Sequence, residues 1–426
     1  MCHALMRLLC GTVGVALLWM GALTRPAQTS PVSPAALPAE VIVKLTSSAD
    51  LATVAADYAL DPTPIDRFRS HSIYRLRILD GASPRDKASV LMADSLFRVV
   101  YAEPNLPTQA PEGQGHVLWA GGGGAGDYVA QWAALKIRLS EAHAVTSGAG
   151  ITVGVLDTGV DLTHPALAAR LVSGFDFVDA DADPSEVGVY GANPLFGHGT
   201  HVAGLVNLAA PDAMIMPLRV LDQNGLGDEW TVAAALAYAI DPDGNPATND
   251  GASVINLSMS SIEQSNLIRD VLKAVTCSDP DRASPDDLPC FLTEGRGAVV
   301  IAAAGNRSSS IPEYPAGDRV AGSLSVGAST QTDTVASFSN YGSWVSLAAP
   351  GEGILSTVPG GGYGTWSGTS MAAPLVAGTA ALVRAANPSL STAKTVQRIV
   401  SKAIDIRGSI RYRVDAAAAL ESRRSR

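Results

Sequence analysis

The chain has 426 residues, of which 47% are apolar and only 5% are aromatic, and its formal net charge is −10. This length predicts two or three folded units, and a sequence rich in Ala, Val, Leu and Gly suits the packed layers of an α/β fold. Nothing in it builds the clustered basic surface of a nucleic-acid-binding protein, so we expect no nucleic-acid partner.

The first 27 residues have the pattern of a secretory signal peptide. Arg7 precedes an almost wholly apolar run, Leu8–Leu23, and the small residues Ala22 and Ala27 stand where a signal is cut. A membrane anchor is the alternative, but the run is shorter than the ~20 residues that span a bilayer. We therefore expect an exported protein, secreted or periplasmic, with no stable membrane span after the signal is removed.

Two linkers frame a small folded unit. Residues 28–38 are rich in Pro, Ser and Ala, which predicts the first linker. Residues 39–105 alternate between strand and helix patterns and predict a compact α+β unit. Residues 106–126 predict the second linker, because the run Gly121–Gly124 cannot hold a regular element. The expected strands of the small unit are Val41–Leu45, Ser72–Ile78 and Arg98–Ala102, and its expected helices are Leu51–Leu60 and Pro84–Met92.

Residues 127–421 predict the main domain, and the basic residues 422–426 a solvated tail. Buried strands alternate with helical patterns here, which predicts a doubly wound parallel sheet of the α/β class. The expected strands are Ile151–Leu156, Ala213–Val220, Ser253–Leu257, Ala298–Ala303 and Ser323–Val326, and the expected helices are Val202–Leu208, Thr231–Ile240, Asn266–Val275, Met371–Ala385 and Thr392–Ala403.

Two of the four cysteines, Cys2 and Cys10, lie in the expected signal peptide. Cys277 and Cys290 remain, and two remaining cysteines in an exported protein usually pair. We expect a disulfide that stabilises the fold by about 3 kcal/mol in the chain-entropy treatment, with two free thiols as the alternative.

Three segments place polar side chains at the ends of expected elements. Asp157 ends an apolar strand, at the edge where open α/β sheets hold their sites, although turn capping explains a lone aspartate equally well. His198 and His201 begin an apolar helix, but they lack the spacing and the Glu of a zinc-binding H-E-x-x-H motif, so we expect no metal there and a packed, structural role for His201. Ser370 opens a long apolar helix, where free N–H groups favour a developing oxyanion.

Together these segments resemble the subtilisin-like serine peptidases, whose triad runs in the order Asp, His, Ser. The resemblance extends from about Gln131 to Leu420 and includes Ile301–Asn306, which matches the family's oxyanion-hole segment. It implies an endopeptidase that acts on polypeptides without a required cofactor. Ser370 would form the acyl-enzyme, His198 would exchange its proton, Asp157 would orient the imidazole, and Asn306 would bind the oxyanion.

The resemblance also implies substrate-binding residues. Ser258, Met259 and Ser260 match the strand edge that pairs with extended peptides, although the family usually has Gly where Ser260 and Ser261 stand. Glu313 matches the floor of the S1 pocket, where many members have Gly. A buried, unpaired carboxylate there would attract Lys or Arg, and an outward-turned, solvated Glu313 is the alternative.

Residues 39–105, with the ending Tyr101–Asn105, resemble the family's inhibitory propeptide, so the chain would be its own intramolecular inhibitor; a permanent accessory domain is the alternative. The family's usual calcium site is expected to be absent, because Leu205–Ala213 is too short for its loop. The acidic loop 241–250 is a second calcium candidate, but it lacks the full EF-hand pattern and favours a solvated turn.

Two other functions stay open beside a monomeric endopeptidase. A catalytically inactive binding module would have the same fold, although the complete set of catalytic residues argues against it. A peptide ligase would use the same acyl-enzyme with an amine acceptor, although the sequence contains no evident lid over the site.

Overall fold

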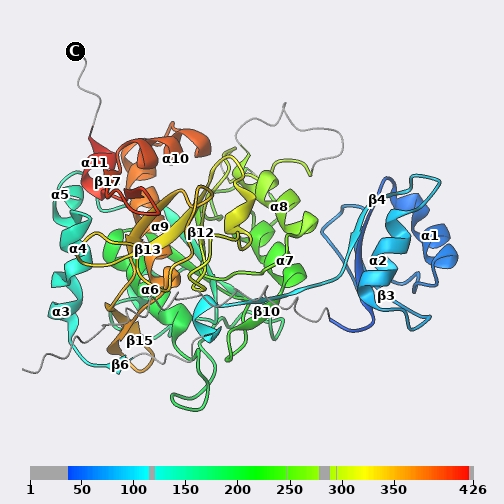
Figure 1. Ribbon diagram of the computed structural model, residues 1–426, viewed down its shortest axis with the longest axis horizontal. Coiled ribbons are helices and arrows are strands. Elements are labelled where there is room, and N and C mark those ends of the chain that lie inside the picture. The colour runs from blue at the N-terminus through cyan, green and yellow to red at the C-terminus, as the bar shows by residue number, and fades with distance from the viewer. Residues whose placement is uncertain (1–36, 115–119, 246, 278–287, 294, 422–426) are drawn as a thin grey trace, which may run out of the picture. The chain divides into compact units, whose positions relative to one another are not determined.

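The computed structural model describes residues 37–114, 120–245, 247–277, 288–293 and 295–421 (Figure 1). The expected signal peptide at 1–27 and the basic tail lie outside these residues. The chain divides into the units Met1–Val32 and Ser33–Arg426, and everything below concerns the second.

The small N-terminal part is an antiparallel sheet with two helices packed against it. β1 (Glu40–Leu45) pairs with β3 (Ile73–Arg77) and β4 (Val99–Glu103), and β2 (Asp66–Arg67) pairs with β3 at the edge. The helix α1 (Leu51–Asp57) follows a 3-10 turn at Ser48–Asp50. The helix α2 (Pro84–Met92) begins after its N-cap residue, Ser83. Every strand and helix that the sequence predicts between residues 41 and 102 is present.

The main domain is built on a nine-stranded sheet that is parallel except at one edge. Its order is β17-β18-β14-β13-β12-β11-β7-β9-β8, and only β17 and β18 pair antiparallel. The order reverses beside β7, because the chain continues from β7 to β9 on one side and later to β11 on the other. In chain order the strands are β7 (Thr152–Asp157), β8 (Phe175–Asp176), β9 (Met214–Arg219), β11 (Val254–Leu257), β12 (Val299–Ala303), β13 (Ser323–Ser329), β14 (Leu347–Pro350), β17 (Ile404–Asp405) and β18 (Tyr412–Arg413).

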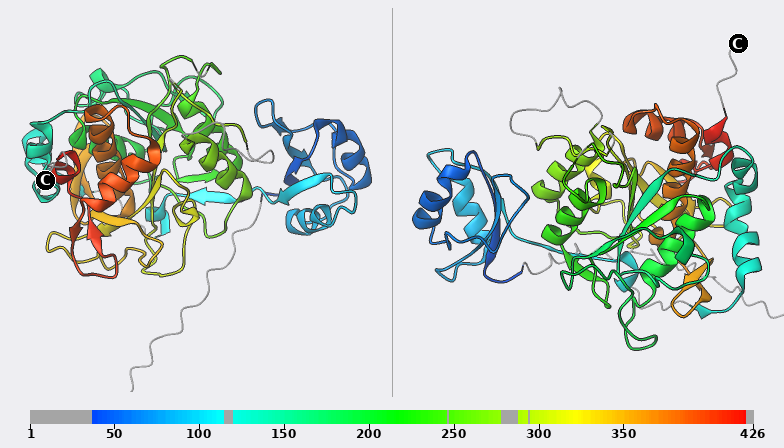
Figure 2. Two further views of the ribbon diagram at one scale, coloured as in Figure 1. Left: turned by 90° about the horizontal axis from the view of Figure 1, so that it is seen from above. Right: turned by 180° about the vertical axis from the view of Figure 1, so that it is seen from behind.

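Helices cover the sheet and confirm the predicted doubly wound α/β class (Figure 2). α6 (His198–Ala209) packs against α9 (Thr369–Ala386), and α7 (Glu229–Ile240) packs against α8 (Asn266–Thr276). In the described part of the chain α9 is the one helix long and apolar enough to cross a membrane, and it is a buried core helix. The remaining helices are α3 (Ala125–Ala130), α4 (Trp132–Lys136), α5 (Leu139–His143), α10 (Thr392–Ser401) and α11 (Ala416–Leu420).

The expectation that the second linker holds no regular element is wrong. β5 (Pro107–Gln109) pairs with β10 (Leu226–Asp228), and the 3-10 turn η2 (Pro111–Gln114) follows it. β6 (Ala120–Gly121) joins a second small sheet with β16 (Gly362–Trp366) and β15 (Ile354–Val358). The hydrogen-bond partners of these linker strands come from positions more than a hundred residues away, so the local composition contains no sign of them.

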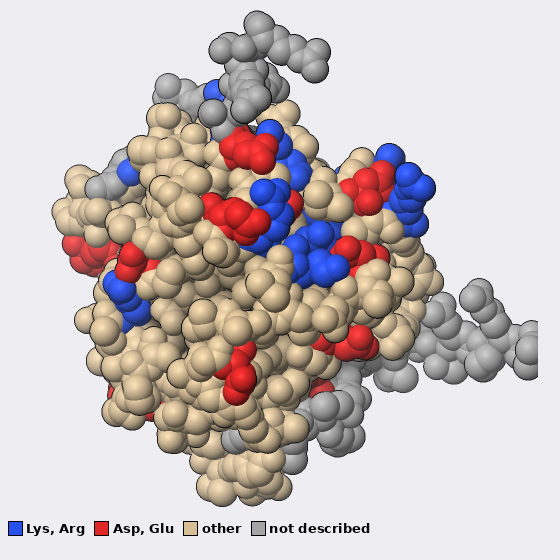
Figure 3. Space-filling view, turned by 90° about the vertical axis from the view of Figure 1, so that its left-hand side faces the viewer, with Lys and Arg blue, Asp and Glu red and all other residues tan. Residues whose placement is uncertain are grey.

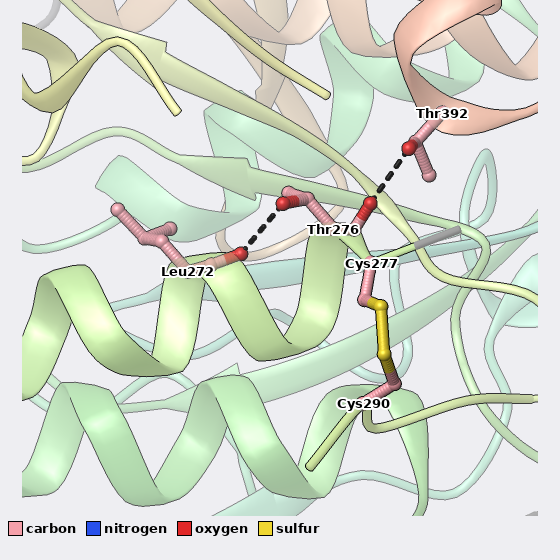
Figure 4. Close-up of a disulfide and its surroundings, with 5 residues drawn as sticks. All are labelled: Leu272, Thr276, Cys277, Cys290 and Thr392. Atoms are coloured by element: carbon pink, nitrogen blue, oxygen red, sulfur yellow. Dashed lines mark hydrogen bonds between the residues drawn. A yellow bond between two sulfur atoms is a disulfide. The ribbon is translucent and has the colours of Figure 1, made fainter. Parts of the chain in front are cut away.

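The expected disulfide is present and lies beyond the end of α8 (Figure 4). Cys277 and Cys290 are bonded, with their Cα atoms 5.5 Å apart. Beside the bridge, the Thr276 hydroxyl donates to the Leu272 carbonyl at 2.7 Å, and the Thr276 carbonyl accepts from the Thr392 hydroxyl at 2.6 Å. The end of α8 is therefore fixed both covalently and by α10.

Charges of both signs lie side by side on the face that carries α4 and α5 (Figure 3). Lys136 pairs with Asp333 at 3.1 Å, and Arg138 pairs with Asp415 at 3.2 Å. On the described part of this face, acidic and basic side chains therefore alternate and do not form a broad area of one sign.

Candidate active site

Three expected catalytic side chains meet at the carboxyl edge of the sheet. Asp157 ends β7, His198 begins α6, and Ser370 is the second residue of α9. β9 and β11 lie on opposite sides of β7, so the strand order reverses there. Open α/β sheets bind their ligands at the carboxyl ends of the strands beside such a reversal.

Asp157 holds the imidazole of His198 in a fixed orientation. His198 Nδ1 donates to Asp157 Oδ1 at 2.6 Å, and the backbone N–H of Thr158 donates to the same oxygen at 2.8 Å. Burial would lower the pKa of His198, but the carboxylates of Asp157 and Glu112 outweigh it and raise the pKa to about 10. The imidazole of His198 is therefore protonated and positively charged, with the carboxylates of Asp157 and Glu112 on its two ring nitrogens.

A buried glutamate that the sequence did not single out supports this pair. Glu186 accepts the hydroxyls of Thr158 at 2.7 Å and Thr200 at 2.8 Å, which flank Asp157 and His198 in the chain. Thr158 in turn accepts the backbone N–H of Gly199 at 2.9 Å. Burial raises the pKa of Glu186 to about 7. Glu186 thus ties the end of β7 to the start of α6.

His201 has the structural role that the sequence predicts. It is fully buried, and its Nε2 points to the carbonyls of Gly364 at 3.1 Å and Ile354 at 3.2 Å. Burial lowers its pKa to about 3, so the ring is neutral near pH 7.

Asn306 and Ser370 form a pocket of hydrogen-bond donors. The Asn306 Oδ1 atom accepts the N–H and the hydroxyl of Thr369, both at 2.9 Å, while its Nδ2 and the Ser370 N–H donate to the same oxygen atom, Glu112 Oε1. Gly305, with φ 99°, supplies the left-handed turn between β12 and this amide. The expected oxyanion donors therefore lie together at the start of α9.

One further side chain occupies this site, and no pattern in the sequence marked it. Glu112, in the second linker, is 4% exposed. Its Oε2 accepts from Ser370 Oγ at 2.6 Å and from His198 Nε2 at 3.0 Å. Its Oε1 accepts from Asn306 Nδ2 at 2.8 Å and from the Ser370 backbone N–H at 3.4 Å.

The expected substrate edge is paired with the linker strand. Gln109 and Ser260 exchange two backbone hydrogen bonds, at 2.9 and 3.1 Å, while β10 lies on the other side of β5. Ser258 is buried beneath the nucleophile and donates its hydroxyl to the Ser370 carbonyl at 3.1 Å. Met259 lines a small pocket with Thr108 and Tyr314.

Glu313 is buried, which contradicts the alternative that it turns outward. It is 3% exposed, its Oε2 accepts the Ser260 hydroxyl at 2.6 Å, and its Oε1 accepts the Asn340 amide at 2.8 Å. Arg307 Nε lies 3.4 Å from the same Oε1. A Cβ on Gly305 would come within 2.6 Å of Oε2, so the carboxylate spans the space from Ser260 to Gly305.

Within the described ranges, no group of three or more His, Cys, Asp or Glu side chains is placed to hold a metal ion. In the acidic loop, Asp243 accepts the Asn245 N–H at 2.8 Å and the Thr248 hydroxyl at 3.2 Å, as in a polar turn.

Several proteins that are similar to this chain in sequence are serine peptidases. A thermophilic serine proteinase of Bacillus sp. (strain AK1) is 37% identical over 296 residues, which cover 67% of this chain and 63% of that protein. Thermitase of Thermoactinomyces vulgaris is 35% identical over 271 residues, which cover 61% of this chain and 84% of that protein. The chain thus spans less than two thirds of the first relative's length.

Solved structures agree. A cold-adapted subtilisin-like serine proteinase has a TM-score of 0.52 and 33% identity, covering 63% of this chain and 90% of that chain. Fervidolysin from Fervidobacterium pennivorans, a keratinolytic enzyme related to subtilisin, covers 91% of this chain and 61% of that chain, with a TM-score of 0.69; its 24% identity is evidence of a shared fold alone. The sequence model of the subtilase family matches residues 148–423, which are more than half of the chain. The chain therefore belongs to the subtilase family of serine peptidases and has the subtilisin-like α/β fold.

Proposed function

We propose that this chain is the precursor of an exported, monomeric serine endopeptidase whose triad is Asp157, His198 and Ser370. The observation that carries the proposal is the meeting of Ser370 Oγ and His198 Nε2 at one oxygen atom, at 2.6 and 3.0 Å, while Asp157 holds the other ring nitrogen at 2.6 Å. The shared atom is Glu112 Oε2. When Glu112 leaves the site, the Ser370 hydroxyl can donate directly to His198 Nε2 and pass its proton to the ring.

The steps follow from these positions. Ser370 Oγ attacks the scissile carbonyl carbon, and His198 Nε2 takes the hydroxyl proton. The negative charge moves to the carbonyl oxygen, where the Asn306 amide and the Ser370 N–H stabilise it. His198 then gives the proton to the departing amine, and water repeats the sequence to release the acyl group. No metal or cofactor is required for any step.

Substrates are polypeptides in an extended conformation. The linker strand between Ser260 and β10 occupies the position that such a peptide would take, with backbone bonds on both sides. The side chain before the cut would then lie between Ser258–Ser260 and Gly305–Asn306.

We also propose that this S1 pocket takes small side chains. An attraction to Lys or Arg required an unpaired carboxylate, but Glu313 has Arg307, Asn340 and Ser260 as partners. Because Ser260 and Glu313 join across the pocket, they leave little depth for a large P1 group.

Residues 39–105 would inhibit the enzyme until they are removed. Glu103 supports this proposal, since it accepts the N–H groups of Asn266 and Leu267 at 2.8 and 2.9 Å and so caps α8 of the main domain. Lys44 adds an ion pair with Asp270 of α8 at 2.8 Å.

Incubation of the processed protein with casein, beside a Ser370→Ala control, tests the activity. An endopeptidase releases soluble peptides, an inactive binding module releases none, and a ligase returns joined or cyclised products that mass spectrometry detects. Only Ser370-dependent hydrolysis supports the proposal.

A further inference from the structure

We propose that Glu112 is an inhibitory ligand of the active site, whose side-chain carboxylate takes the place of a substrate's reacting carbonyl. The inference rests on the proposed peptidase function. It goes beyond general inhibition by residues 39–105, because it assigns the block at the catalytic atoms to one side chain outside that unit.

The four contacts of Glu112 coincide with the groups that the reaction needs. One carboxylate oxygen binds both the nucleophile and the base, and the other binds both oxyanion donors. With its hydroxyl donated to Glu112, Ser370 cannot donate to His198. The close fit also depends on Gly368, since a Cβ there would meet Glu112 Oε1 at 1.8 Å.

The backbone around Glu112 is not presented for cleavage. The extended pairing runs through Gln109, and the Ala110 N–H still donates to the Gly225 carbonyl at 3.0 Å. Pro111 then has no N–H for the next acceptor on the strand edge, the Ser258 carbonyl, and the 3-10 turn begins there. The chain therefore stops being extended at Pro111, before it reaches Ser370. The side chain of Glu112, and not a peptide bond, then lies against the Ser370 hydroxyl.

Charge explains why a carboxylate is tolerated in so buried a place. Burial by itself would raise the pKa of Glu112. The hydrogen bond and the positive charge of His198, and the side-chain hydrogen bonds from Ser370 and Asn306, outweigh burial and lower the pKa. Glu112 and Asp157 thus flank a protonated His198. A buried charge with four partners is stable, whereas a neutral side chain at this position would lose the ion pair.

Covalent labelling of the full chain tests the role of Glu112. An alkyl fluorophosphonate forms a bond from phosphorus to Ser370 Oγ and releases fluoride, while His198 accepts the hydroxyl proton. The labelling rate of the unprocessed chain, separated by size from processed protein, is measured for wild type, Glu112→Gln and Glu112→Ala. Glu352→Gln, on an exposed loop, is the matched control, and Ser370→Ala shows that the label is on the nucleophile.

We expect unprocessed Glu112→Gln and Glu112→Ala to label at least tenfold faster than wild type and Glu352→Gln. Glu112→Gln keeps the shape of the side chain, so it remains informative if Glu112→Ala folds poorly. Equal rates for wild type and Glu112→Gln, together with rapid labelling of processed enzyme, would overturn the inference and leave the peptidase function standing. If processed enzyme also fails to label, the proposed function itself is wrong.

Discussion

The Ser260 hydroxyl donates to the carboxylate of Glu313 at 2.6 Å, across the pocket proposed for the P1 side chain. The hydrogen bond thus joins the two residues that are proposed to border this pocket. Because Arg307 and Asn340 also contact Glu313, the carboxylate is held in place.

This pair predicts the P1 preference. Peptides with Ala or Ser at P1 should be cut faster than those with Phe, Leu, Lys or Arg. Replacing both residues by Gly opens the pocket, and kcat/KM for Phe over Ala should rise by about 10-fold or more, which is at least the discrimination that one methylene group gives in a hydrophobic pocket. Fast cleavage after Phe in the wild type, or after Arg, would contradict the proposed depth of the pocket.

Latency should weaken at alkaline pH. The ionisable groups that contact the His198 ring are Asp157 and Glu112; Glu186 binds Thr158, the residue after Asp157, and the nearby His201 is neutral. Glu112 helps to raise the pKa of His198 to about 10. The ion pair between Glu112 and protonated His198 is therefore fully formed below the pKa that His198 has without Glu112, and it is lost as the pH rises through about 10.

Fluorophosphonate labelling of unprocessed wild type should therefore accelerate between neutral pH and pH 10, and Glu112→Gln should flatten that rise. An identical pH dependence in the two proteins would show that Glu112 does not set the His198 charge.

Glu103 should control the affinity of residues 39–105 for the mature enzyme. Its carboxylate accepts two backbone N–H groups and the hydroxyl of Ser265, and hydrogen bonds to a charged group contribute ~1.5–3 kcal/mol. Glu103→Ala in the isolated segment should raise its inhibition constant by about 10- to 100-fold, whereas Glu40→Ala, which removes only a side-chain contact to Asn105, should change it far less. An unchanged inhibition constant for Glu103→Ala would show that the cap on α8 does not set the affinity, and no inhibition by the wild-type segment at micromolar concentration would favour a permanent accessory role.

Loss of the disulfide should lower stability without changing the chemistry. Cys277→Ser with Cys290→Ser should reduce the free energy of unfolding by about 3 kcal/mol in the chain-entropy treatment, and thermal unfolding should shift downward by several degrees. The kcat of the processed double variant should stay near wild type, because the bridge lies beyond α8 and not at the triad. Two alkylatable thiols in the native protein would refute the pairing itself.

Sequence patterns and structure agree where an interaction is local or is carried by a motif. The strand that ends at Asp157 and the helix that begins at His198 are both read from continuous apolar runs beside a polar residue. Glu112 and β5 were missed, because an isolated Glu in a Pro- and Gly-rich linker acquires meaning only when distant residues such as Ser260 and Ser370 surround it. Glu186 was missed for the same reason, since its partners Thr158 and Thr200 are ordinary neighbours of the triad in sequence.

The most direct test of the account is the kcat of processed enzyme for a peptide substrate in Ser370→Ala, with His198→Ala measured in parallel. Both should lose about 10⁶-fold in kcat, with KM little changed, because each removes a group that acts only in the transition state; the scale is the one measured in subtilisin itself. Equal losses for both variants are expected, since nucleophile and base act as a unit. Hydrolysis by Ser370→Ala within tenfold of wild type would contradict the assignment of Ser370 as the nucleophile.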